Sequence, residues 1–363
     1  MKTLLRLLLK SQHQQNRSGP AQTEKGMTLI ELLIGTVMAF LIITPMLGFV
    51  VDMLNTDRRE QIKSNTEQDI QAAVDFIAQD LSQAIYIYDN NAINLGSAAT
   101  PATPATPAIR NQLPAAPANT TGTPILVFWK RQQIPKSLPI ENGIKPNQCQ
   151  DTANANKCND TYVLSLVAYY QIKDTTTNST WCQPSGGDCP TRIARYEIRD
   201  GIKDPLTQQP YADGDIKDGQ KRDPAFDSRF VLSDPKTNVT LPAGLTLPTS
   251  GAKKPEVLVN YIDYSPLPAN QAPTGQQCQT DLGVTPPTGP GAPTFNAADL
   301  LITDPSNHSF YACVDSSRNL ARVTIRGNSL RRLQPNDAKY DASKSAFFPT
   351  ATVQVQGLGA RGK

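Results

Sequence analysis

The chain has 363 residues, enough for one large domain or two ordinary ones, with 39% hydrophobic and 18% charged residues. Five Lys or Arg and one acidic residue lie in positions 1–26, and removing them from the totals of 35 basic and 32 acidic residues leaves 30 against 31. The formal net charge of +3 therefore belongs to one short segment and gives no argument for a nucleic-acid partner.

Residues 27–51 form an apolar segment that carries a single charge, on Glu31. A helix needs about 20 apolar residues to cross a hydrocarbon core, whereas the apolar part of a secretory signal peptide has only about 7–15. The segment therefore predicts a transmembrane helix, which Pro45 should kink because proline removes a backbone donor. Because Lys and Arg precede it, the positive-inside rule predicts a cytoplasmic N-terminus and an exported C-terminal part.

Glu31 is unusual because a carboxylate within a membrane costs at least about 2.5 kcal/mol and usually has a partner or a function. No cation lies within the segment, but a cut between Gly26 and Met27 would create a free α-amino group four residues upstream of Glu31. The alternative is a plain membrane anchor with one glutamate near its start.

A basic leader, residues 1–26, ends in Gly26 and is followed by the sequence MTLIE, with Glu31 at its fifth position. This arrangement resembles the processing site of the type IV prepilin family. The resemblance implies that a prepilin peptidase cleaves after Gly26 and methylates the new amine of Met27. It also implies that Glu31 pairs with the Met27 amine of a neighbouring subunit, and in a medium of low dielectric such a pair can set the register of assembly.

Residues 52–89 are predicted to continue the helix as an amphipathic segment, because apolar residues recur at spacings of three and four. These residues are Ile70, Val74, Ile77, Leu81, Ile85 and Tyr88. One helix is thus expected from Thr28 to Tyr88, embedded in the membrane in its first half and packed on a core in its second. The run 69–84 resembles the corresponding stretch of minor pilins and pseudopilins of the PilW and GspJ kind.

Residues 90–124 are rich in Pro, Ala and Thr and include the tract TPATPATPA. Such a composition cannot bury a core and favours extended backbone, so the segment is predicted to be a loop. A rigid spacer that presents a neighbouring part of the chain is the alternative.

Residues 125–363 are predicted to form a β-rich exported domain, because short runs of β-branched and aromatic residues recur between turn-forming segments. The predicted strands are Ile125–Trp129, Thr161–Ile172, Arg192–Arg199, Glu256–Tyr264, Ser309–Val314, Leu320–Arg326 and Ala351–Val355. No helical pattern longer than about ten residues competes with them. The expected fold class is α+β, a long N-terminal helix packed on antiparallel sheet, as the pilin resemblance also implies.

All six cysteines lie beyond the apolar segment, and no two have the C-x-x-C spacing of zinc or redox sites. They are Cys149, Cys158, Cys182, Cys189, Cys278 and Cys313. An even number beyond a membrane segment predicts structural disulfides in an oxidising compartment such as a periplasm. Of the 15 possible connectivities, proximity in sequence suggests Cys149–Cys158, Cys182–Cys189 and, by exclusion, Cys278–Cys313. The alternative is six reduced, buried thiols in a cytosolic protein.

Residues 200–227 are rich in aspartate, and Asp213, Asp215 and Asp218 are weak candidates for a calcium site, because calcium takes about six to eight oxygen ligands. The spacing does not match an EF-hand loop: counted from Asp213, Lys217 occupies the fifth position and no Glu stands at the twelfth. A solvated polar loop is favoured, and calcium is the one cofactor considered.

Five arginines form the one basic cluster after residue 26. They are Arg318, Arg322, Arg326, Arg331 and Arg332. Alternation predicts that Arg322 and Arg326 share an exposed strand face, while the apolar residues at 321, 323 and 325 face the core. An exposed arginine row could hold an acidic polysaccharide, DNA or the carboxylates of a partner pilin. A solvated strand face is favoured over such a site.

Enzyme motifs are missing from the sequence. Of the two histidines, His13 lies in the leader and His308 stands alone, which argues against a multi-histidine metal site and a His-based triad. Neither a G-x-S-x-G motif nor a Walker loop is found. A catalytic function is therefore not expected.

The resemblance as a whole predicts a minor pilin or pseudopilin, a structural subunit of a type IV pilus-like fibre or secretion pseudopilus. Such a protein is expected first as a single-pass protein of the inner membrane, with its C-terminal domain outside, and after processing in a fibre. The expected partners are other pilins or pseudopilins, a prepilin peptidase, the inner membrane, and pilus or type II-like assembly machinery.

The Pro-rich segment, the Cys-bearing segment Trp181–Arg199 and the Arg-rich strand resemble the pseudopilins of cyanobacterial hormogonium polysaccharide secretion. That resemblance implies a role in polysaccharide secretion and gliding motility, with the exported polysaccharide as a further partner. The alternatives are a type II secretion minor pseudopilin and a fibre-tip adhesin that binds polysaccharide or DNA through residues 318–332.

Overall fold

The computed structural model describes the chain from Thr28 onward, with several gaps. The described residues are 28–95, 108–149, 151–154, 156–217, 219–226, 254–291 and 294–358. Gly26, Met27 and Asp218, on which the predicted processing site and part of the predicted calcium site fall, lie outside them. The chain divides into two units, Met1–Arg58 and Arg59–Lys363.

Helix α2, Leu29–Ser82, contains residues 29–51 of the predicted transmembrane segment. Residues 28–61 are all exposed, so the apolar half of the helix has no core of its own to pack on. The hydroxyls of Thr36 and Thr44 donate to backbone carbonyl oxygens in the preceding turn, which satisfies them within the helix. By its length and composition α2 is a candidate membrane span. The helix continues through Pro45, and a kink there stays a prediction.

The second half of α2 buries one face, and its end differs from the predicted one. The buried residues are Thr66, Ile70, Ala73, Val74, Ile77, Asp80 and Leu81. The predicted extension to Tyr88 is wrong, because the helix ends at Ser82 and Ala84–Ile87 form strand β1. Alternating Ile and Tyr at positions 85–88 favour a strand, and pairing with a neighbouring strand satisfies the backbone groups of β1.

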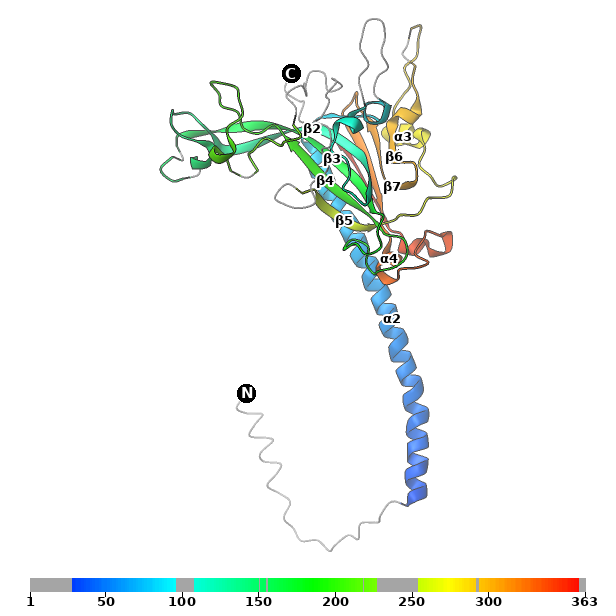
Figure 1. Ribbon diagram of the computed structural model, residues 1–363. Helices are drawn as coiled ribbons and strands as arrows, with labels where there is room; N and C mark the ends of the chain where they lie inside the picture. The colour runs from blue at the N-terminus through cyan, green and yellow to red at the C-terminus, as the bar shows by residue number, and fades with distance from the viewer. Residues whose placement is uncertain are drawn as a thin grey trace, which may run out of the picture. The chain divides into compact units, whose positions relative to one another are not determined.

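The strands that the structure describes in the second unit form two antiparallel sheets (Figure 1). The five-stranded sheet has the order β1-β2-β3-β4-β5, with β2 at Thr120–Pro139, β3 at Cys158–Asp174, β4 at Thr191–Arg199 and β5 at Glu256–Ile262. The four-stranded sheet has the order β6-β7-β8-β9, with β6 at Leu301–Asp304, β7 at Asn307–Asp315, β8 at Leu320–Arg326 and β9 at Thr350–Gln356. Two short helices, α3 (Gly275–Leu282) and α4 (Ser329–Leu333), connect strands. The predicted mixture of a long apolar helix with antiparallel sheet is confirmed.

Each of the seven predicted strands overlaps an observed one, but two strands were missed. These are β1 and β6, which have four residues each. The prediction of a loop for residues 90–124 is also partly wrong, because β2 begins at Thr120. In the same segment Ile109 and Leu113 lie in the main core, so these two apolar side chains outweigh the Pro-rich composition around them.

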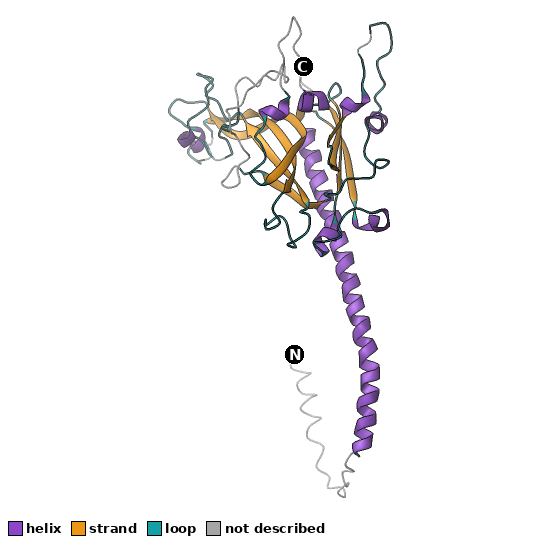
Figure 2. Cartoon of the chain, turned by 45° about the vertical axis from the view of Figure 1, so that its right-hand side comes forward, coloured by secondary structure: helices purple, strands orange, loops and turns teal. Residues whose placement is uncertain are grey.

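The two sheets share one core with the second half of α2. Ile262, at the end of β5, bridges to Gly327 just after β8. Elsewhere the hydroxyl of Thr123 in β2 donates to the carboxylate of Asp304 in β6 at 2.7 Å. Figure 2 shows the C-terminal half of α2 running beside both sheets. One face of β7 and β8 is therefore occupied by the main core, and part of their opposite face packs against α3.

Candidate functional site

Glu31 lies in the first turn of α2, where the helix dipole favours a carboxylate. Its backbone N–H donates to the hydroxyl of Thr28 at 3.3 Å, which is the contact of an N-cap. The side chain of Glu31 is exposed and has no ion-pair partner among the described residues. Its expected partner, the amine of Met27 in another subunit, falls outside what the structure describes.

A buried cluster of charged side chains ties the second half of α2 to the five-stranded sheet. Asp80 of α2 accepts hydrogen bonds from Lys130 of β2 at 2.8 Å, from Arg195 of β4 at 2.7 Å and from the Tyr169 hydroxyl of β3 at 2.8 Å. Glu197 adds a second carboxylate, 2.8 Å from Arg195 and 3.6 Å from Lys130. The four charged side chains are only 7–11% exposed, so the cluster is closed to ligands.

The electrostatics of this charged cluster keep both carboxylates ionised. Burial alone would raise the pKa of Asp80, but the hydrogen bonds and charges of Arg195 and Lys130 outweigh it and lower that pKa. Burial likewise opposes ionisation of Glu197, yet the charges of Lys130, Arg199 and Arg195 lower its pKa to about 2. The cluster therefore consists of mutually compensated ions, which is the arrangement that buried charges require.

Reasoning from the sequence did not identify this charged cluster, although two signals pointed to it. Asp80 interrupts the apolar face of α2 three residues after Ile77, at helical spacing. Lys130 follows directly on the apolar run Ile125–Trp129. A charged residue at a buried position of a helix or strand needs a partner, but which partner it meets depends on how the strands align.

Arg331, in α4, is fully buried and does not belong to an exposed arginine row. Its Nε donates to the carbonyl oxygen of Asp188 at 2.7 Å, and its Nη2 donates to those of Pro184 and Gly186, both at 2.9 Å. These carbonyl groups belong to the loop that the Cys182–Cys189 disulfide closes. Arg331 therefore fastens this loop to α4.

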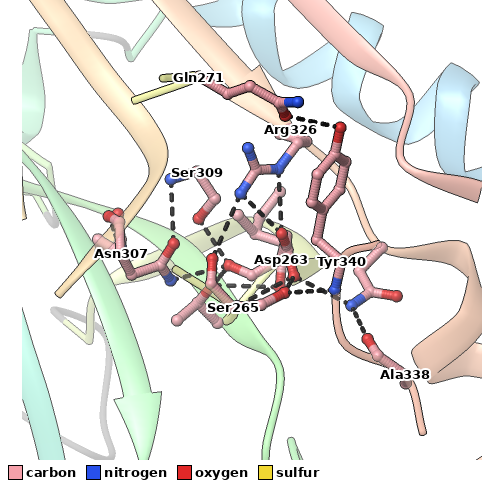
Figure 3. Close-up of polar contacts among 12 residues, drawn as sticks. Asp263, Ser265, Gln271, Asn307, Ser309, Arg326, Ala338 and Tyr340 are labelled. Carbon is pink, nitrogen blue, oxygen red and sulfur yellow. Dashed lines mark hydrogen bonds and ion pairs between the residues drawn. The ribbon is translucent and has the colours of Figure 1, made fainter. Parts of the chain in front are cut away.

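Arg326, at the end of β8, is also buried. Its Nε and Nη2 lie 3.0 and 2.7 Å from Oδ2 of Asp263, whose side chain is fully buried. Figure 3 shows this pair beside the ring of Tyr340, and the guanidinium carbon lies 5.1 Å from the ring centroid. Asn307 and Ser309 of β7 donate to the backbone carbonyl of Asp263, at 2.8 and 2.6 Å. The pair thus holds the chain after β5 against the four-stranded sheet.

The remaining three arginines of the predicted cluster each have a carboxylate partner. The partners are Asp315 for Arg318, Asp281 for Arg322 and Asp69 of α2 for Arg332. The apolar residues at 321, 323 and 325 do face the core, as predicted. The prediction of an exposed ligand-binding row is wrong for Arg326 and Arg331, because strand alternation says which face a side chain takes and not what covers that face.

The six cysteines form three disulfides, Cys149–Cys158, Cys182–Cys189 and Cys278–Cys313, the connectivity that proximity in sequence suggests. The second lies in the connection between β3 and β4. The third joins α3 to β7 and so fixes a helix on the face of the four-stranded sheet opposite the main core.

Two of the three aspartates predicted as weak calcium candidates are described by the structure. Asp213 and Asp215 lie in a short 3₁₀ helix, and Asp215 pairs with Lys145 at 2.5 Å. Within the parts of the chain that the structure describes, no three metal-ligating side chains converge. Asp218 lies outside those parts.

Comparison of the chain with known protein families, with curated proteins and with solved structures finds no match.

Proposed function

We propose that this chain is a minor pilin or pseudopilin, a structural and non-catalytic subunit of a type IV pilus-like fibre or secretion pseudopilus. The observation that carries the proposal is the difference in surroundings between the two halves of one helix. The first half of α2 exposes apolar side chains and carries Glu31 in its first turn. The ion pairs of Asp80 hold the second half of α2 against the β-rich part of the second unit, which we call the head.

The sequence around Gly26 supports this proposal together with the helix. Cleavage after Gly26 would give the chain an N-terminal Met27, whose amine is the cation that a membrane-embedded Glu31 lacks. Because a misplaced subunit would leave one of these charges unpaired in a low dielectric, the pair would fix how far neighbouring helices slide. The partners would be a prepilin peptidase in the inner membrane, other pilin-like subunits, and the machinery that assembles them.

A role in polysaccharide secretion and gliding motility is part of the proposal and rests on the resemblance of the Pro-rich, Cys-bearing and Arg-rich segments. A type II secretion pseudopilin would have the same helix and head, so the two roles are distinguished by the cargo that fails to leave the cell when the gene is deleted. Disulfides in the head support an exported location for it, because they persist in oxidising compartments.

The test is incorporation of a Glu31→Ala variant into sheared surface fibres, measured by immunoblotting of the fibre and membrane fractions. We expect Glu31→Ala to be processed normally and to stay in the membrane fraction. Glu31→Gln removes only the charge and should likewise not enter the fibres. Glu60→Ala is the matched control, since Glu60 lies on the same helix, is exposed and, among the described residues, pairs with nearby Lys63. Incorporation of Glu31→Ala at the control level would overturn the assembly proposal.

A further inference from the structure

A cleft of about 410 Å³ opens on the face of the four-stranded sheet that lies opposite the main core. Its floor is formed by β7 and β8, through Tyr311 and Arg326. Gln277 of α3 lines one wall, and Tyr340 and Phe348 line another. Ligand sites for small molecules commonly measure about 300–1,000 Å³, so the cleft has room for one or two rings.

The walls of this cleft are fixed before any ligand arrives. The Cys278–Cys313 disulfide joins α3 to β7, and both cysteines are themselves part of the lining. On the other wall, the hydroxyl of Tyr340 donates to the side-chain oxygen of Gln271 at 2.9 Å, as Figure 3 shows. A site whose walls are already held in place loses little entropy on binding.

The charges in and under the cleft cancel. Arg326 is neutralised by Asp263 beneath it, and Asp281, which lines the cleft, lies 3.6 Å from Arg322. Burial and the charge of Arg326 lower the pKa of His308, so this residue is neutral at pH 7. A cleft without net charge does not select a phosphate backbone, whose binding depends on unpaired cations.

Several hydrogen-bonding groups around the cleft have no partner among the described residues. They are Nη1 of Arg326 and the side-chain NH₂ groups of Gln271 and Gln277. The other atoms of these groups are already engaged, since Gln277 accepts from the backbone of Thr274 at 3.0 Å and Gln271 accepts from Tyr340. These NH groups can donate to a ligand rich in hydroxyl groups. Nδ1 of His308 is engaged by the hydroxyl of Thr303 at 3.1 Å, which leaves Nε2 as the ring nitrogen that can meet a ligand hydroxyl.

The sheet beneath the cleft argues against an extended peptide as the ligand. β7 lies between β6 and β8, and β8 lies between β7 and β9, so the backbone groups of the floor are used within the sheet. A peptide strand binds by adding to a free sheet edge, which this floor does not offer. Recognition must therefore come from side chains, which here include two amides, the guanidinium of Arg326, the imidazole of His308 and the half-buried rings of Tyr311 and Tyr340.

We propose that this cleft binds one or two sugar residues of a neutral glycan, with hydroxyl groups meeting Gln271, Gln277 and Arg326 and the apolar face of a sugar ring lying on the aromatic side chains. This combination of neutral polar groups and aromatic surface suits a molecule with many hydroxyls and no charge. The site is distinct from the helix that carries fibre assembly, and its existence does not depend on assembly.

The experiment uses the full-length chain in a detergent that contains no sugar. Saturation-transfer NMR is recorded with cellobiose, maltose, lactose and chitobiose as neutral probes, and with digalacturonate and a single-stranded thymidine oligonucleotide as anionic ones. We expect at least one neutral disaccharide to receive saturation, and the Gln271→Ala/His308→Ala double variant to weaken its Kd at least about tenfold. Gln276→Ala is the matched control, because Gln276 is exposed on α3 outside the cleft lining.

Thermal unfolding of each variant distinguishes a loss of binding from a loss of folding. Gln271 is exposed and His308 is partly exposed, so neither substitution removes a fully buried side chain. If the double variant unfolds at a lower temperature than the wild type, Tyr340→Phe serves as a second test. This variant keeps the aromatic ring but removes the hydroxyl that holds the side chain of Gln271 in place, so it should weaken binding. The proposal is overturned if no neutral disaccharide binds, if only the anionic probes bind, or if the cleft variants bind as well as Gln276→Ala does.

Discussion

Asp80 in α2 and Arg195 in β4 form a buried ion pair, with Nε of Arg195 2.7 Å from Oδ2 of Asp80, although 115 residues separate them in the chain. Lys130 and Glu197 complete the cluster, so two carboxylates face two cations out of water. Removing one partner of such a set lowers the free energy of unfolding by more than the ion pair itself contributes, because the remaining charges stay buried without compensation.

Replacing Asp80 by Ala should therefore destabilise the folded head strongly. We expect a loss of about 3–5 kcal/mol, because Lys130 and Arg195 would be left as buried cations. Asp80→Asn should cost nearly as much, since it keeps the shape of the side chain but removes the charge. Urea denaturation of the full-length protein, followed by tryptophan fluorescence, measures both changes.

Asp75→Ala is the matched control for this prediction. Asp75 lies on the same helix, is exposed, and accepts a hydrogen bond from Gln71 within the same face of α2. Its replacement should change the free energy of unfolding by less than about 0.5 kcal/mol. Equal losses for the Asp75 and Asp80 variants would mean that the buried cluster does not hold α2 on the sheet.

The same charged cluster predicts how stability depends on pH. The folded-state pKa of Glu197 is about 2, below its ordinary value of 4.5, so the stabilisation is complete above pH 4.5 and is lost as pH falls toward 2. As the pH falls through that window, the unfolded chain binds the proton before the folded chain does, so acidification lowers the free energy of unfolding. Asp80 shifts in the same direction.

Glu197→Gln isolates this dependence on pH. The variant should be less stable at pH 7, because Lys130, Arg195 and the adjacent Arg199 would lose the charge of Glu197. Its melting temperature should fall less steeply between pH 4.5 and pH 2. Differential scanning calorimetry across that range provides the comparison. Parallel curves for the two proteins would show that Glu197 is not the group responsible.

The strands and the long helix could be predicted because their signals are local. In β8 the apolar residues at 321, 323 and 325 alternate with polar ones, and that alternation alone places them on the core. What covers the other face of β8 is not local information. Arg326 points away from the core and is nevertheless buried, because Asp263 and Tyr340 reach it from distant parts of the chain.

The end of α2 and the short strands illustrate the same limit. Ile85 and Tyr88 continue the helical spacing, yet the Ile-Tyr alternation at 85–88 fits a strand equally well, and pairing with β2 decides between them. Strand β6 has four residues, which is too few for a periodic pattern to stand out. The cleft could not be predicted at all, since its lining comes from α3, β7, β8 and the chain around Tyr340.

Arg331 provides a prediction that separates folding from ligand binding. Because it is fully buried and donates to the carbonyls of Asp188, Pro184 and Gly186, Arg331→Ala should leave those acceptors without partners and destabilise the head by about 3 kcal/mol or more. Arg331→Lys should also fail to restore the contacts, since an ammonium cannot reproduce a planar fork. Hydrogen exchange of residues 182–189 should accelerate in both variants.

Arg318→Ala is the contrasting variant, because Arg318 is 43% exposed and its partners, the carboxylate of Asp315 and the carbonyl oxygen of Leu282, lie outside the Cys182–Cys189 loop. Its effect on stability should stay below about 1 kcal/mol. Unchanged exchange in the Cys182–Cys189 loop of Arg331→Ala would contradict the role assigned to Arg331.

The predicted processing site between Gly26 and Met27 can be tested independently of the β-rich part of the chain. In a host with a prepilin peptidase, we expect the mature chain to begin at Met27 and to carry one N-terminal methyl group, which intact-mass spectrometry detects. Gly26→Asp should leave residues 1–26 attached, because the resemblance places a glycine at the end of the leader. Gly19→Asp is the matched control, since it introduces the same charge into the leader seven residues before the cut and should be cleaved normally. Cleavage of Gly26→Asp at the control rate, or a wild-type chain that retains its leader, would remove the origin of the amine that Glu31 needs.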